Sequence, residues 1–165
     1  MANFLKAGIA LALTTTAAIA DGHAQNWDMP MAYAATNYHS EQGVIFADRV
    51  REYTDGAINI TVHPGGSLFG GGDIKRAVQT GQVPIGERFM SAHANEAPLL
   101  AWDNLPFIAT SYADNAKLWD AARDSVNAQL ADLNLVALYT CPWPGQGFYF
   151  NKEVASSADT QGIKF

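Results

Sequence analysis

Strand-like and helix-like segments alternate along this chain, and that alternation most restricts the folds open to it. Apolar residues at Ile58, Ile60 and Val62 give the segment 57–63 the period of two that is typical of a strand. The segment 41–53 before it carries apolar residues at helical spacing, and Gly56 behind it is suited to end a helix. Strands separated by helices predict a mostly parallel sheet that is covered by helices on its faces.

The same patterns, followed along the whole chain, predict an α/β fold with the order β-α-β-α-β-α-β-β. The expected strands cover 26–35, 57–63, 83–88, 133–140 and 148–151, with a further strand beginning at 163–165. The expected helices cover 41–53, 74–80 and a segment from 111 to 130 or 133. Ser40, Asp73 and Ser111 precede these helices and are suited to begin them as caps.

The N-terminal segment has the layout of a secretory signal peptide. Lys6 is the only charged residue before an uncharged run over 7–20, and small residues follow at two alternative cleavage sites. We expect cleavage after Ala24, with Ala20 as the second choice, and therefore a signal peptide over 1–24 and an exported protein. No apolar run reaches the roughly 20 residues that a membrane-spanning helix needs, so we do not expect membrane insertion.

Charge and cysteine content exclude several classes of function. Ten Lys and Arg residues against 16 Asp and Glu residues give a net charge of −6, which argues against a nucleic-acid partner. Cys141 is the only cysteine, so an internal disulfide is impossible. The histidines lack metal-ligand spacing, and the glycine-rich segment 64–72 lacks the Lys-Ser/Thr pair of a phosphate loop. We therefore expect neither a metal nor a cofactor.

Three loops are expected to meet at the carboxyl ends of the strands, where ligands bind in sheets of this kind. They cover 36–39, 86–90 and 141–146. In the third loop two prolines fix the backbone around Trp143, which is suited either to contact a small polar molecule or to pack in the core. Glu87 and Arg88 are suited either to form an ion pair or to contact a ligand.

Several segments together resemble the solute-binding proteins of tripartite ATP-independent periplasmic (TRAP) transporters, of the DctP type. The residues that carry the resemblance lie in 46–56 (FADRVREYTDG), 58–68 (INITVHPGGSL), 74–87 (IKRAVQTGQVPIGE), 105–107 (LPF) and 146–165. The resemblance implies a periplasmic protein of two lobes, like the type II periplasmic binding proteins. It also implies that a small organic acid binds between the lobes and is delivered to the subunits of a membrane permease.

The resemblance further implies which residues contact the ligand. Glu87 is expected to line the cleft from the first lobe, together with Asn37 and Tyr38 in the loop before the first helix. Gln146 stands where many relatives carry a first ligand-binding arginine, and this departure favours an acid other than a sialic acid. With Arg88 and Trp143, these residues form the candidate ligand-binding set.

The resemblance also implies how the chain divides. We expect a first lobe over 25–147 and a hinge or crossover strand with the start of a second lobe over 148–165. The family's Gly-x-Lys-x-Arg strand is represented by Gly162-Ile163-Lys164-Phe165, one residue short of its ligand-binding arginine. We therefore expect an N-terminal part of a two-lobed protein, with impaired binding and no enzymatic activity. Two alternatives stay open: a small secreted enzyme that uses Glu87 as acid or base, and a binding module that dimerises through an exposed sheet edge.

Overall fold

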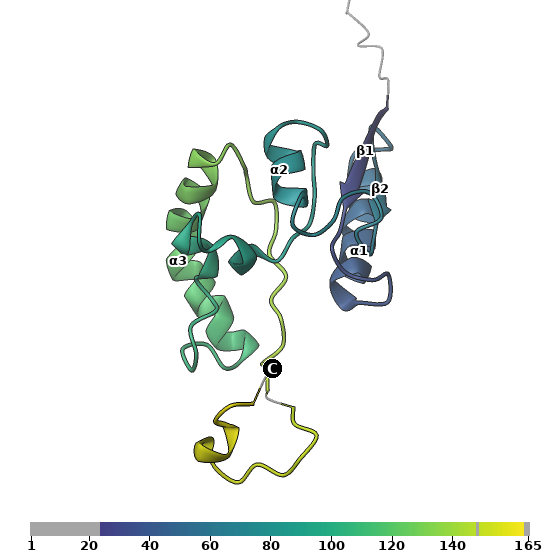
Figure 1. Cartoon of the computed structure of the whole chain (residues 1–165). Helices are drawn as coiled ribbons and strands as arrows, with labels where there is room; N and C mark the ends of the chain where they lie inside the picture. The colour runs from purple at the N-terminus through teal and green to yellow at the C-terminus, as the bar shows by residue number, and fades with distance from the viewer. Residues whose placement is uncertain (1–23, 148, 164–165) are drawn as a thin grey trace, which may run out of the picture.

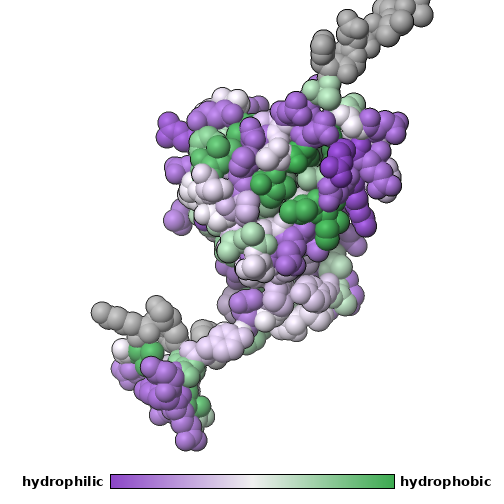
Figure 2. Space-filling view, turned by 90° about the vertical axis from the view of Figure 1, so that its right-hand side faces the viewer, coloured by the Kyte–Doolittle hydropathy of each residue, from purple (hydrophilic) through white to green (hydrophobic). Residues whose placement is uncertain are grey.

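The computed structural model describes residues 24–147 and 149–163, and in these ranges it has an α/β fold (Figure 1). The strands are β1 (Gln25–Pro30) and β2 (Ile58–His63). The α-helices are α1 (Tyr38–Tyr53), α2 (Ile74–Gln79) and α3 (Tyr112–Asp132), and the 3-10 helices are η1 (Met90–His93), η2 (Pro98–Ala101) and η3 (Ser157–Thr160). β1, β2 and α1 lie on one side of the molecule and α3 on the other, with an extended stretch of chain between them. Residues 149–163 lie apart from this body in both views (Figures 1 and 2).

β1 and β2 pair in parallel, as the alternation of strands and helices predicted. The register runs from Gln25 opposite Ile58 to Pro30 opposite His63, with α1 as the connection. Met29 and Met31 point to the face that α1 covers and are buried there with Ile85. α1 approaches this face closely at Gly43, where an added Cβ would lie 2.5 Å from the Met31 sulfur. A larger residue at this position would therefore force the Met31 side chain to move.

The segment 83–88, which we predicted to be a strand, contributes a single parallel bridge between Glu87 and Met31. The Glu87 amide donates a hydrogen bond of 3.0 Å to the carbonyl of Pro30, so the segment runs beside β1 on the edge away from β2. Pro84 has no amide hydrogen to donate to a ladder, which helps to explain why a regular strand does not form. Gly86 lies close to Ile74 and Val78 of α2.

A second hydrophobic core joins α3 to η2. Leu100, Val126 and Leu130 are buried in it, and the rings of Trp102 and Trp119 pack beside them. The Ser111 hydroxyl accepts a hydrogen bond of 3.1 Å from the amide of Asp114, so the predicted start of this helix is confirmed.

The prediction of a strand over 133–140 is wrong. The segment forms no strand, although its residues alternate as they would in one. Leu135 and Ala137 pack against the core of α3, while Val136 and Leu138, which alternate with them, are largely exposed. Strand structure requires a partner backbone, and within the described ranges no backbone hydrogen bond links 136–140 to another segment. Residues 149–151 also form no strand, and Phe148 and 164–165 lie outside the described residues, as does the predicted signal peptide up to His23.

Two of the predicted caps are corrected. α1 begins three residues earlier than expected, because the side chain of Asn37 accepts a hydrogen bond from the His39 amide. Ser40 lies inside the helix instead, and its hydroxyl donates to the carbonyl of Tyr33. Asp73 occupies the cap position of α2 without a capping hydrogen bond from its side chain.

The side of the molecule that carries β1, β2 and α1 shows apolar side chains in its middle, surrounded by hydrophilic ones (Figure 2). α1 exposes Val44 and Ile45 to solvent. Within the described ranges, no helix is both long enough and apolar enough to cross a membrane.

Candidate ligand-binding site

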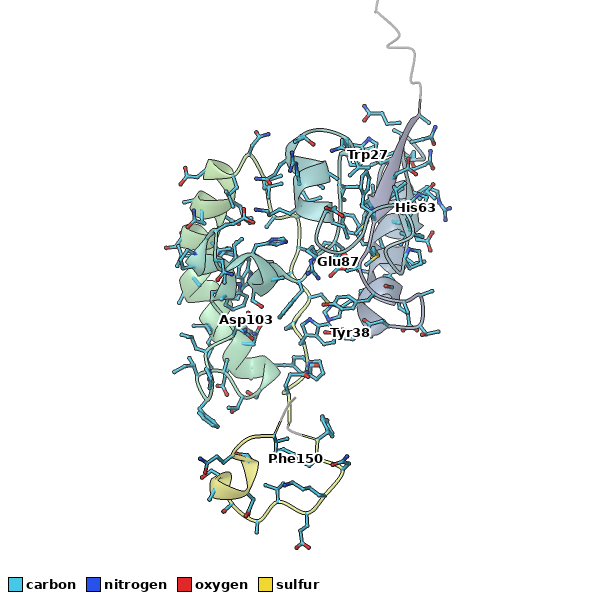
Figure 3. The ribbon with its side chains drawn as sticks, in the orientation of Figure 1. Trp27, Tyr38, His63, Glu87, Asp103 and Phe150 are labelled. Atoms are coloured by element: carbon cyan, nitrogen blue, oxygen red, sulfur yellow. The ribbon has the colours of Figure 1, made fainter. Side chains whose placement is uncertain are left out.

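A cavity of about 390 Å³ lies between the segment 84–91 and the extended segment 134–143. α2 and α3 contribute apolar walls, through residues such as Ile74, Val78 and Leu130. The loops contribute the polar part of the wall, with His39, Glu87, Arg88 and His93. In Figure 3, Glu87 lies in the middle of the molecule beside the extended chain, and Tyr38 lies near it at the start of α1. The cavity therefore lies at the ends of β1 and of the segment beside it, where ligands bind in parallel sheets.

Glu87 brings a buried carboxylate to this cavity. Its backbone is held by the bridge to Met31, while its Oε2 atom is buried and has no hydrogen-bond partner within the described part of the chain. Burial raises the pKa of the Glu87 carboxyl, and the neighbouring Arg88 guanidinium opposes that rise. A buried acceptor without a partner is costly, so this oxygen is suited to accept a hydrogen bond from a ligand.

Arg88 brings a cation to the same region. Burial raises the pKa of Tyr33, and the positive charge of the nearby Arg88 guanidinium partly offsets that rise. The Nε atom of Arg88 is also buried without a partner. The cavity wall therefore offers both a hydrogen-bond acceptor and a charged donor.

Aromatic rings from all three loops surround Trp143. Its ring centroid lies 4.2 Å from that of His39, 5.2 Å from Tyr33, 6.1 Å from Tyr38 and 6.3 Å from Phe89. The Tyr38, Tyr33 and Phe89 rings meet Trp143 edge to face, the geometry that aromatic pairs favour. The Tyr38 hydroxyl donates to the carbonyl of Pro142 and so ties the start of α1 to the third loop. The expectation that the three loops meet is confirmed by these contacts.

His39 is the most enclosed polar side chain of this cluster, with 3% of its surface exposed. Its ring lies 4.1 Å from the ring of Tyr38, centroid to centroid. Neither ring nitrogen has a hydrogen-bond partner within the described ranges. Burial lowers the pKa of His39, so the ring is uncharged at neutral pH.

The fold brings some of the candidate ligand-binding residues together at the cavity, and leaves others away from it. Glu87, Arg88 and Trp143 line the cavity, and Tyr38 packs on Trp143 at its edge. Asn37 serves as the cap of α1, and Gln146 is exposed, does not line the cavity and donates to the carbonyl of Pro144. Trp143 packs among aromatic rings and also lines the cavity, so its packing leaves the predicted ligand contact open.

Sequence reasoning missed four residues of this site: Tyr33, His39, Phe89 and Tyr139. Tyr33 was expected in the strand over 26–35, and His39 was weighed as a metal ligand and expected to have a loop or capping role. Phe89 follows Glu87 and Arg88 directly, and that adjacency was an available signal. Burial, together with the charge of Glu87, raises the pKa of Tyr139 to about 12, so its hydroxyl stays protonated. No group of three or more potential metal ligands is present among the residues that the structure describes.

The match to a family model covers residues 31–165, and the family is described as bacterial extracellular solute-binding protein, family 7 (DctP). Among solved structures, the chain is 82% identical to a TRAP solute-binding protein of an unidentified marine microbe known from a metagenome. That protein was solved with co-purified pyroglutamate; the TM-score is 0.83, and the match covers 86% of this chain and 46% of that chain.

Two receptors from Bordetella pertussis are similar as well. DctP7, an extracytoplasmic solute receptor that binds pyroglutamic acid, is 40% identical with a TM-score of 0.80, over 84% of this chain and 46% of that one. DctP6, which also binds pyroglutamic acid, is 39% identical with a TM-score of 0.70, over 73% and 40% respectively. The chain thus spans about half the length of the solved relatives that it matches. A cavity where three loops meet is consistent with these matches to solute-binding proteins. The chain belongs to the DctP family of bacterial extracellular solute-binding proteins.

Proposed function

We propose that this chain contributes to the capture of pyroglutamate as part of the solute-binding component of a TRAP transporter. The observation that carries the proposal is the 82% identity to a protein solved with co-purified pyroglutamate, over 86% of this chain. Both Bordetella receptors described above also bind this acid. The family and these relatives are solute-binding proteins, which favours binding over acid–base catalysis at Glu87.

The chemistry of the cavity wall supports this ligand. Pyroglutamate is a five-membered lactam that carries a carboxylate, so it presents a ring face, an amide N–H and an anionic group. The rings around Trp143 are suited to pack on the ligand ring, and the unpartnered Oε2 of Glu87 is suited to accept from the N–H. The Arg88 guanidinium is suited to attract the carboxylate. In this proposal the ligand carboxylate points away from Glu87, because like charges repel.

The wider role rests on the family. We propose that residues 1–24 direct export to the periplasm, that 25–147 form a ligand-binding lobe and that 148–165 begin the crossover to a second lobe. The separate position of 149–163 supports a boundary near residue 147 (Figure 1). Closure of two lobes on the acid would then present a surface to the permease subunits, by differential affinity of the ligand for the closed state.

Titration of the 165-residue chain with a panel of acids tests the ligand. The panel contains pyroglutamate, C4-dicarboxylates, 2-oxo acids and sugar acids, and ligand-detected NMR extends the measurement to millimolar dissociation constants. We expect pyroglutamate to bind best, but more weakly than micromolar, and we expect Glu87→Gln to change the ranking. Glu52→Gln, at an exposed position of α1, serves as the matched control. Preference for another acid class would contradict the proposal.

A further inference from the structure

We propose that His39 determines specificity by donating a hydrogen bond from its uncharged ring to the lactam carbonyl of the ligand. This inference rests on the proposed function and extends it, because it names which feature of the acid is recognised. It would make the site selective for lactam acids over acids of similar size that lack the carbonyl.

The first observation is that the His39 ring is buried and unsatisfied. Only 3% of its surface is exposed, and both ring nitrogens lack hydrogen-bond partners within the described part of the chain. Buried polar groups in native proteins are nearly always paired, so an unpaired imidazole calls for a partner that is absent from the chain itself. The ring also lines the cavity that contains Glu87 and Trp143.

The second observation is that the ring is held in place. Its centroid lies 4.2 Å from the ring of Trp143 and 4.1 Å from that of Tyr38. The His39 backbone is fixed as well, because its amide donates to the side chain of Asn37 at 3.0 Å. A donor fixed by its neighbours loses little freedom when a ligand binds, and such preorganised groups discriminate well between ligands.

The third observation is the absence of charge on the ring at neutral pH. Burial among aromatic rings lowers the pKa of His39, so the ring has one N–H donor and no net charge. A neutral donor matches a neutral carbonyl, whereas the guanidinium of Arg88 matches the ligand carboxylate. If His39 served only to fill space, its two nitrogens would be an unnecessary cost that a phenylalanine would avoid.

A site built to bond one polar group rejects analogues that lack it, because its own buried donor is then left unpaired. Proline is the matched analogue, since it has the same ring size and carboxylate as pyroglutamate but no ring carbonyl. The test measures dissociation constants of both acids by ligand-detected NMR for the 165-residue chain and three variants. His39→Phe removes both nitrogens, and His39→Gln retains a neutral donor. His63→Gln is the control histidine variant, because His63, the last residue of β2, does not line the cavity and contacts Asp28 instead.

We expect His39→Phe to weaken pyroglutamate binding about tenfold and proline binding less than about twofold, with partial recovery in His39→Gln. We expect the His63→Gln variant to bind both acids as the unaltered chain does. An equal loss for both acids would show that the ring only shapes the site, and no loss for pyroglutamate would show that it makes no contact; either result overturns the inference. Failure of the unaltered chain to bind pyroglutamate overturns the proposed function as well, and so is distinguished from the other two results.

A second readout covers a variant that does not fold. In the unaltered chain, the ring nitrogens of His39 can be followed by nitrogen-15 NMR. We expect pyroglutamate to shift the protonated nitrogen in the direction of a stronger hydrogen bond, and proline to leave it unchanged. The same shift with both acids, or none with either, would overturn the assignment.

Discussion

Substitution of Gly86 by alanine should destabilise the protein, because Gly86 lies where the cavity wall packs against α2. An added Cβ at Gly86 would lie 2.8 Å from Cγ2 of Ile74 and 3.2 Å from Cγ2 of Val78. Carbon atoms pack best at about 3.5–4.0 Å, so α2 or the segment 84–88 must move by several tenths of an ångström. Overpacking of this kind costs about 1–3 kcal/mol, and the loss of glycine freedom in the unfolded chain returns about 0.4–1 kcal/mol. The expected net loss of unfolding free energy is about 1–2 kcal/mol.

Gly72 provides the matched control for that substitution. It has no atom within 4 Å of an added Cβ and no positive φ, so Gly72→Ala should be neutral or slightly stabilising. Urea unfolding followed by circular dichroism measures both variants. In an Ile74→Ala background the closest contact is removed, and the cost of Gly86→Ala should fall by about 1 kcal/mol, as expected for residues in contact. Equal stabilities of the Gly86 and Gly72 variants, or an unchanged cost in the Ile74→Ala background, would refute the reasoning.

Three further predictions concern the cap of α3, the buried histidine and the aromatic cluster. Ser111→Ala removes the cap that bonds the Asp114 amide and should cost about 1 kcal/mol of unfolding free energy, measured in the same urea assay. Burial lowers the pKa of His39 below its ordinary value of 6.5, so the unfolded chain binds more protons between those two values. Stability should therefore fall as the pH falls through 6.5, and urea titrations at pH 7 and pH 5 should show a smaller fall for His39→Gln than for the unaltered chain. Trp143→Ala should cost about 2–3 kcal/mol, less than truncation of a fully buried Trp because the ring is partly exposed to the cavity, and a loss below about 1 kcal/mol in thermal unfolding would contradict this.

Patterns that depend on neighbours in the sequence predicted the fold well. The parallel pair of β1 and β2, the bounds of α1 to within three residues and the start of α3 at Ser111 all follow from periodicity and capping. Strand formation in the segments 83–88 and 133–140 was harder to predict, because a strand forms only when a partner backbone lies beside it. Leu135 and Ala137 keep the alternation of a strand, but the described chain supplies no ladder for them.

The candidate site was predictable only as far as loops at strand ends can be placed. Glu87 and Trp143 were found because charge and rigid turns at strand ends stand out in a sequence. His39 was not found, because its two ring nitrogens lack partners only as a result of burial, and that burial depends on rings far apart in the sequence, such as Tyr38 and Trp143. Gln146 stays a predicted ligand contact; in the structure it is exposed, and its amide donates to the carbonyl of Pro144.

The cavity separates two hydrophobic cores, and this arrangement gives ligand binding a structural consequence. One core is built on β1 around Met29, and the other is built on α3 around Val126. The segments that flank the cavity belong to different cores: Glu87 is bridged to β1, whereas Leu135 packs against α3. A ligand that contacts Glu87 on one side and the segment 134–143 on the other adds contacts that neither core can make alone. A ligand that binds only the folded state stabilises that state by an amount that grows with the logarithm of one plus the ratio of ligand concentration to Kd, so a ligand in this cavity would stabilise the packing of both cores together.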